Sequence, residues 1–220
     1  MKVHHFFNSR TTLLIIVNII SLFTFFKILE DIINMESIVL IDLFLNNAVK
    51  LIWNPTLDTI MVLITNILNP AFLTVLCLIL TIILIYKREK HKAYVLISSV
   101  ILGLISEVVI KLLVQRARPI SGLISETGFS FPSGHATIAT IFFLMLIFTF
   151  RKEIKDQTGR TIFTVLSIIL AITIGLSRIY LGVHWISDVL GGFALGIFWV
   201  SVIVLVIKIK TKKHHILRNI

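Results

Sequence analysis

Two histidines in this sequence stand beside residues that could support catalysis. His184 and Asp188 are spaced i, i+4, so on a helix they lie on one face within contact distance. A carboxylate bonded to one imidazole nitrogen fixes the tautomer and leaves the other nitrogen available as a nucleophile or base. His135 follows Ser133 and Gly134, where a hydroxyl and the open amides of a helix start would suit an anion. Taken alone, each signal also fits a structural histidine or a plain helix N-cap.

Cations near these histidines could bind phosphate. Lys111, Arg116 and Arg118 follow one apolar run, and Arg178 ends another. Charges near a membrane surface are costly unless they are solvated or paired, and they commonly mark a functional site. Snorkelling at a helix end would explain Arg116 alone, but not the group. Glu107 precedes Lys111 by four residues, so a helical ion pair could offset the cost of this carboxylate.

The composition favours a membrane protein. The 220 residues are 57% hydrophobic and have a mean hydropathy of +1.00, whereas soluble domains are about 45–50% apolar. The 21 Lys and Arg outnumber the 11 Asp and Glu, but they fall in short tails and turns between apolar runs. We therefore expect anionic lipid headgroups rather than nucleic acid as their partner. The lone Cys77 excludes an intrachain disulfide and a cysteine metal cluster.

Six apolar runs approach the roughly 20 residues that cross a bilayer. They are Thr11–Ile28, Ala71–Tyr86, Ala93–Leu113, Ala136–Phe150, Thr161–Leu176 and Ile186–Ile207. The second, fourth and fifth are short, so their helices must extend into flanking residues. No small-x-small cleavage site follows the first run before Lys27, which favours an uncleaved anchor helix. The predicted fold is all-α: one polytopic membrane bundle of six transmembrane helices over residues 1–220.

The basic residues also predict the orientation. With six spans, one side of the membrane holds both termini and two connections, at Lys87–Lys92 and Arg151–Arg160. That side carries fifteen of the 21 cations: Lys2, Arg10, Lys87, Arg88, Lys90, Lys92, Arg151, Lys152, Lys155, Arg160, Lys208, Lys210, Lys212, Lys213 and Arg218. It should be the cytoplasm. Both termini are then cytoplasmic, and the histidine motifs lie at the extracytoplasmic face.

The stretch Glu30–Pro70 is harder to place. Ile38–Trp53 is apolar but contains Asp42, and Leu57–Leu68 is too short to cross. An added span here would move the later basic connections outside the cell. We expect two amphipathic helices at the outer interface instead. Residues 1–70 then form an anchor helix plus an extracytoplasmic interfacial segment, and residues 71–207 form the motif-bearing core.

Three spaced motifs resemble those of the type 2 phosphatidic acid phosphatase superfamily. Lys-x6-Arg-Pro stands at Lys111 to Arg118-Pro119, and Pro-Ser-Gly-His stands at residues 132–135. Ser-Arg-x5-His-x3-Asp begins at Ser177 and ends at Asp188. All three match in the family's order, and the resemblance covers about Ala71 to Ile207. It points to the bacterial membrane branch, which includes phosphatases of phosphatidylglycerophosphate and undecaprenyl diphosphate.

The resemblance implies a mechanism and a location. His184 attacks phosphorus and forms a phosphohistidine, while Asp188 orients its imidazole. His135 protonates the leaving oxygen and then activates water. The phosphoryl oxygens are held by Lys111, Arg118, Ser133, Gly134 and Arg178. These donors replace the cation that many phosphatases use, so no metal or other cofactor is expected. The enzyme would lie in a bacterial plasma membrane.

Several alternatives stay open. The substrate could be undecaprenyl diphosphate, phosphatidylglycerophosphate or phosphatidic acid, since the motifs contact only the shared phosphate. A lipid phosphotransferase or a headgroup-binding transporter would need a similar basic pocket. A vanadium haloperoxidase uses the same constellation, but those relatives are soluble. The oligomeric state is undetermined by the sequence.

Overall fold

The structure, a computed structural model, describes residues 9–120 and 122–217. These residues form helices and connections without a strand. The helices are α1 (Ser9–Ile33), α2 (Ser37–Lys50), α3 (Pro55–Ile67), α4 (Pro70–Tyr86), α5 (Lys90–Val114), α6 (Gly134–Phe150), α7 (Gln157–Tyr180) and α8 (Ile186–Leu217). The all-α prediction is therefore confirmed for this part of the chain. Two of the predicted cytoplasmic cations, Lys2 and Arg218, lie outside the described residues.

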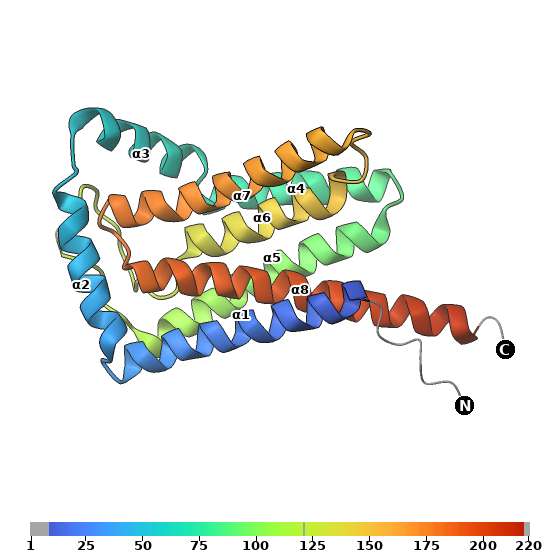
Figure 1. Cartoon of the computed structure of the whole chain (residues 1–220), viewed down its shortest axis with the longest axis horizontal. Coiled ribbons are helices and arrows are strands. Elements are labelled where there is room, and N and C mark those ends of the chain that lie inside the picture. The colour runs from blue at the N-terminus through green and yellow to red at the C-terminus, as the bar shows by residue number, and fades with distance from the viewer. Residues whose placement is uncertain (1–8, 121, 218–220) are drawn as a thin grey trace.

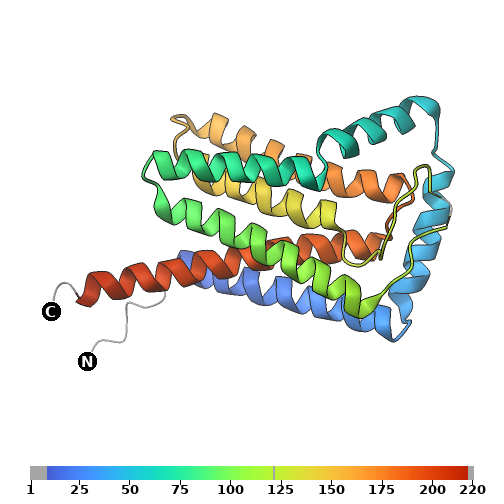
Figure 2. The same cartoon turned by 180° about the vertical axis from the view of Figure 1, so that it is seen from behind.

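The helices form a bundle around α6. Helix α6 packs against α4, α5, α7 and α8, and most of its residues are buried. Helix α1 lies along α8 on one flank, and α2 crosses the end of the bundle (Figures 1 and 2). Large apolar side chains on the outer faces of α1, α4, α5 and α7 are exposed. In water this surface would be unfavourable, so it indicates a lipid environment.

Within the described residues, four helices are long and apolar enough to cross a membrane: α1, α5, α7 and α8. The consecutive helices α3 and α4, bent by 41° at the break between them, pass the same test together and would make a fifth span. Helix α6 is apolar but has only 17 residues. The chain is therefore a multi-pass membrane protein, while the count of six spans and the interfacial position of α2 and α3 stay predictions.

The bend between α3 and α4 has a local cause. Both helices begin with an Asn-Pro pair, in which the asparagine caps the helix and proline occupies its first position. Asn54 Oδ1 accepts from the backbone N–H of Leu57 at 3.0 Å, and Asn69 Oδ1 accepts from that of Phe72 at 2.8 Å. The second cap starts a new helix at Pro70, so the chain changes direction there instead of continuing α3.

The connections separate into two ends of the bundle. The α5–α6 and α7–α8 connections, which carry the histidine motifs, lie beside α2 at one end (Figure 1). The α4–α5 and α6–α7 connections lie at the opposite end, with the beginning of α1 (Figures 1 and 2). The fold thus brings the motifs together and keeps them apart from the two basic connections, as the charge pattern requires.

Candidate active site

The predicted histidine–aspartate pair is formed at the start of α8. Nδ1 of His184 lies 3.3 Å from Oδ2 of Asp188. The same oxygen accepts the backbone N–H of Trp185 at 2.9 Å. Both side chains are buried, and that of Asp188 is 0% exposed. The carboxylate, held by the first turn of α8, therefore fixes the orientation of the imidazole ring.

Arg118 determines which nitrogen of His184 carries the proton. Its Nη1 lies 3.0 Å from Nε2 of His184. A guanidinium can only donate, so Nε2 must accept, and the proton of the neutral ring is on Nδ1, facing Asp188. Burial lowers the pKa of His184 to about 4, although the hydrogen bond and charge of Asp188 oppose this shift. At neutral pH the ring is therefore uncharged, and the lone pair of Nε2 faces away from the carboxylate.

The α5–α6 connection holds the Arg118 side chain in place. Its Nε donates to the carbonyl of Gly128 at 3.0 Å, and its Nη2 approaches the carbonyls of Thr127 and Phe129 at 3.3 Å. Nη1 also donates to the carbonyl of Val183 at 2.9 Å. These acceptors are neutral dipoles, so much of the guanidinium charge remains available to an anion at His184.

Arg178 approaches the site from the end of α7. The side chain is 1% exposed, and its Nη1 donates to Oγ1 of Thr65 at 2.5 Å. Nη2 forms an ion pair with Glu126 of the α5–α6 connection. Burial alone would raise the pKa of the Glu126 carboxyl, but the charges of Arg178 and Arg118 hold that pKa below its usual value. An ionised carboxylate therefore occupies one donor edge of Arg178.

The Pro-Ser-Gly-His segment lies directly against the His184 segment. The backbone N–H of Ser133 donates to the carbonyl of Asp188 at 3.0 Å, and His135, half-buried in the first turn of α6, lies within electrostatic range of His184 and Arg178. Oγ of Ser133 and Nε of Arg178 are buried and have no hydrogen-bond partner among the described residues. Unpaired buried donors are costly, so these two groups suit a ligand with oxygen acceptors.

Lys111 joins the site through Glu107. Its Nζ lies 2.7 Å from Oε1 of Glu107, which forms the i, i+4 ion pair that the sequence suggested. The carboxylate packs against the start of α6: a Cβ on Gly134 would lie 2.4 Å from the same oxygen. A glycine at this position therefore allows α5 and α6 to approach, with the Glu107–Lys111 pair between them.

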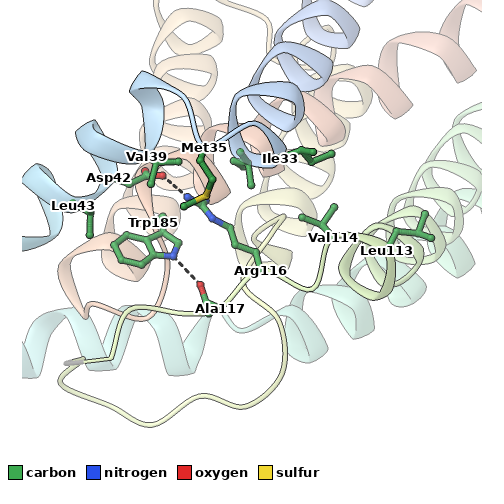
Figure 3. Close-up of a pocket in the computed structure, with 11 residues that line it drawn as sticks. Ile33, Met35, Val39, Asp42, Leu43, Leu113, Val114, Arg116, Ala117 and Trp185 are labelled. Atoms are coloured by element: carbon green, nitrogen blue, oxygen red, sulfur yellow. Dashed lines mark hydrogen bonds and ion pairs between the residues drawn. The ribbon is translucent and has the colours of Figure 1, made fainter.

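Asp42 is a site residue that the sequence did not indicate, and Arg116, which was grouped with the cations that could bind phosphate, is paired with two carboxylates instead. Snorkelling does not explain Arg116: its side chain is only 10% exposed and is paired with both Asp42 and Asp188. Asp42 of α2, expected in an amphipathic interfacial helix, is 1% exposed. Figure 3 shows its carboxylate pointing toward the guanidinium of Arg116. In the sequence, Asp42 stands out only as an acidic residue within an apolar stretch, and no spacing rule indicates that Arg116 is its partner.

Arg116 and Asp42 line a cavity of about 710 Å³. Its walls are mostly apolar and come from the end of α1, from α2 and from the end of α5 (Figure 3). Trp185, the residue after His184, lines the cavity, and its indole N–H donates to the carbonyl of Ala117 at 2.9 Å. Asp42 and Arg116 provide its charged groups.

Comparison with known proteins shows the family of the chain. The PAP2 superfamily model matches residues 92–212, more than half of the chain. This chain belongs to the PAP2 superfamily. It is 31% identical to phosphatidylglycerophosphatase B of Bacillus subtilis over 181 residues, which cover 81% of this chain and 89% of that protein.

Other PAP2 proteins are similar over part of the chain or in fold. An undecaprenyl-diphosphatase of Sulfolobus acidocaldarius is 31% identical over 54% of this chain and 57% of its own length. The crystal structure of a transmembrane PAP2 phosphatidylglycerolphosphate phosphatase from Bacillus subtilis superposes with a TM-score of 0.73 at 26% identity, covering 83% of this chain and 93% of that one. Aquifex aeolicus LpxE, at 23% identity and a TM-score of 0.59, shares the fold.

Proposed function

We propose that the chain is a metal-independent lipid phosphatase that works through a phosphohistidine at His184. The observation that carries the proposal is the environment of Nε2. Its lone pair accepts from Arg118 at 3.0 Å, while Nδ1 on the other side of the ring faces Asp188. This arrangement supports a neutral nucleophile beside a fixed cation.

In the first step, Nε2 of His184 attacks phosphorus, and the bond from phosphorus to the leaving oxygen breaks. Because phosphorus takes the position in front of Nε2, Nη1 of Arg118 gives up its hydrogen bond to Nε2 and donates to a phosphoryl oxygen, while its bonds to the α5–α6 connection keep the guanidinium in place. His135 donates a proton to the leaving oxygen. Asp188 stabilises the positive charge that develops on the His184 ring.

In the second step, His135 accepts a proton from water while the water oxygen attacks phosphorus. The bond between phosphorus and His184 breaks, and inorganic phosphate is released. The equatorial oxygens are held through both steps by Lys111, Arg118, Arg178, Ser133 and the Gly134 amide. Fixed donors of this kind stabilise the charge of a phosphoryl transition state.

The same donors support the proposal that no metal is needed. Among residues 9–120 and 122–217, no group of three or more His, Cys, Asp or Glu side chains is arranged to hold a metal ion. Because these donors can balance the phosphoryl charge without a cation, phosphate release should persist in EDTA. Activity that disappears with EDTA and returns with a divalent cation, in protein that stays folded, would contradict this part.

The proposed placement in the membrane is supported by the charges and by the arrangement of the two ends of the bundle. We propose six crossings, with α4 and α6 each contributing one, and with α2 and α3 lying at the extracytoplasmic interface. Both termini and the two basic connections are then cytoplasmic. Tagging a cysteine introduced into the α6–α7 connection with a membrane-impermeant reagent tests this: only inverted or permeabilised membranes should react.

The lipid substrate is proposed from the relatives. A phosphatidylglycerophosphatase that matches over 81% of this chain favours phosphatidylglycerophosphate. The undecaprenyl-diphosphatase, which matches over 54%, makes undecaprenyl diphosphate the second candidate, and phosphatidic acid is the third. In all three, an apolar tail can stay in the bilayer while the phosphate enters the basic site.

Phosphate release by the purified protein with each of these lipids, beside the His184→Ala variant, tests the proposal. Wild type should release phosphate and the variant should not. Phosphate passed to an added acceptor lipid instead of water would indicate a transferase. Binding or transport that survives His184→Ala, without hydrolysis in wild type, would indicate a headgroup-binding transporter.

A further inference from the structure

A buried chain of charges connects α2 to Asp188. Nη2 of Arg116 lies 2.5 Å from Oδ2 of Asp42, and Nη1 lies 2.6 Å from Oδ1 of Asp188. The carboxylates are 1% and 0% exposed. One guanidinium therefore joins two buried carboxylates that belong to helices far apart in sequence, and the second of them orients His184.

Asp42 also holds the first turn of α8. Its Oδ1 accepts the backbone N–H of Ser187 at 3.0 Å, and its Oδ2 accepts the hydroxyl of the same serine at 2.6 Å. That hydroxyl in turn accepts from Nη1 of Arg116 at 2.6 Å. The backbone N–H groups of a first turn lack partners within their own helix. Asp42 thus caps α8 from another helix, one residue before Asp188.

The surroundings make this link strong. Most of the cavity wall beside Arg116 is apolar, and the guanidinium carbon lies 5.6 Å from the centre of the Trp185 ring (Figure 3). Water screens charges poorly in such a site. The two carboxylates and one guanidinium together carry one negative charge. Without Asp42, Asp188 alone would neutralise Arg116, so Asp42 leaves more of the negative charge of Asp188 available to His184.

We propose that Asp42 is a positioning residue for the reaction: through Arg116 and Ser187 it fixes the carboxylate of Asp188 and keeps its negative charge directed at His184. This inference rests on the proposed function, because it deepens the role of His184 as nucleophile. It assigns a part of the active site to α2, outside the three sequence motifs.

Removing the Asp42 charge should weaken catalysis without removing a phosphate ligand. In Asp42→Asn, Asp188 alone balances Arg116, and less negative charge stabilises the His184 imidazolium. Partners that orient a metal ligand typically contribute about 10- to 100-fold to activity, and we take the same range by analogy for a residue that orients Asp188. We expect kcat to fall by that factor while KM changes less than about threefold, since Asp42 contacts no proposed phosphate ligand. The pKa of His184 should fall below its wild-type value.

The experiment compares Asp42→Asn with a matched control, Asp58→Asn. Oδ1 of Asp58 accepts from the hydroxyl of Tyr180 at 2.6 Å and so ties α3 to α7. Asp58→Asn therefore removes the charge from an equivalent tether in the neighbouring helix. The readouts are kcat and KM for the best lipid substrate, and the His184 pKa from NMR of ¹⁵N-histidine protein in detergent. The charged and titratable groups facing His184 are Asp188, Arg118, Arg178, Glu126 and His135. All of them are unchanged in both variants.

The expected result is a lower kcat and a lower His184 pKa in Asp42→Asn, with both near wild type in Asp58→Asn. Equal values in all three proteins would overturn the inference. If Asp42→Asn does not fold, Ser187→Ala is the second variant, because it removes the hydroxyl that Asp42 and Arg116 share. It should also lower kcat and the His184 pKa. No shift in Ser187→Ala would likewise overturn the inference. The NMR titration measures the His184 pKa without turnover. A wild-type protein that releases no phosphate would therefore refute the proposed function, while the titration would still test the inference about Asp42.

Discussion

Replacing Asp188 by asparagine creates a donor conflict that no rotamer of the amide avoids. Oδ2 of Asp188 accepts from His184 and from the Trp185 backbone, while Oδ1 accepts from Arg116 at 2.6 Å. An amide has one acceptor and one donor end. If its oxygen takes the Oδ2 position, its NH₂ faces the donating Arg116.

In the other rotamer, the NH₂ group faces His184. Nδ1 must then accept, the proton moves to Nε2, and the nucleophilic lone pair is lost. Either orientation leaves a buried donor unpaired, which costs about 1–3 kcal/mol of stability. For turnover we expect a loss of about 10²- to 10⁴-fold, or roughly 3–5 kcal/mol in the barrier, by analogy with carboxylates that fix a catalytic histidine tautomer.

The assay is single-turnover phosphate release by purified Asp188→Asn, with thermal unfolding measured on the same sample. Asp156→Asn is the matched control, because Asp156 caps α7 at the opposite end of the bundle by accepting the N–H of Gly159 at 2.6 Å, and asparagine caps equally well. A near-normal rate in folded Asp188→Asn would refute the assignment of His184 as nucleophile.

Two further predictions concern the same site. In Gly134→Ala, the added methyl would meet Oε1 of Glu107 at 2.4 Å and displace the Glu107–Lys111 pair. We expect the free energy of unfolding to fall by about 1–3 kcal/mol in a thermal unfolding scan, and KM to rise. Unchanged values would show that the close approach of Gly134 to Glu107 is unimportant. The second follows from the His184 pKa of about 4. Because the neutral ring attacks and protonation inactivates it, phosphoenzyme formation should decline only near pH 4. A decline centred near pH 6.5 in rapid-quench kinetics would contradict the buried, neutral ring.

The motif residues could be predicted because their spacing follows local geometry. The i, i+4 relation predicts the contact between Glu107 and Lys111, which is formed within α5. It also predicts the contact between His184 and Asp188, which is formed although His184 lies before the first residue of α8 and not on the helix. The expectation that the three short runs extend into flanking residues holds unevenly. The fifth run is extended to a 24-residue α7, whereas α4 and α6 have 17 residues each and begin only one and two residues before the predicted runs.

Partners distant in sequence were not predictable. Arg116 and Asp42 are 74 positions apart, and only the crossing of α2 over the end of the bundle brings them together. Likewise, Glu126 lies in a connection without periodicity, so nothing in the sequence indicated its ion pair with Arg178. Tertiary packing of irregular segments determines these contacts, and they fix the orientation of the predicted residues.

The most direct test of the central claim is to trap the phosphoenzyme. Wild type mixed with a ³²P-labelled lipid phosphate and quenched within one turnover should carry acid-labile, base-stable label on the peptide that contains His184. His184→Ala should carry none and release no phosphate. Label on any other residue, or phosphate release by folded His184→Ala at the wild-type rate, would contradict the account.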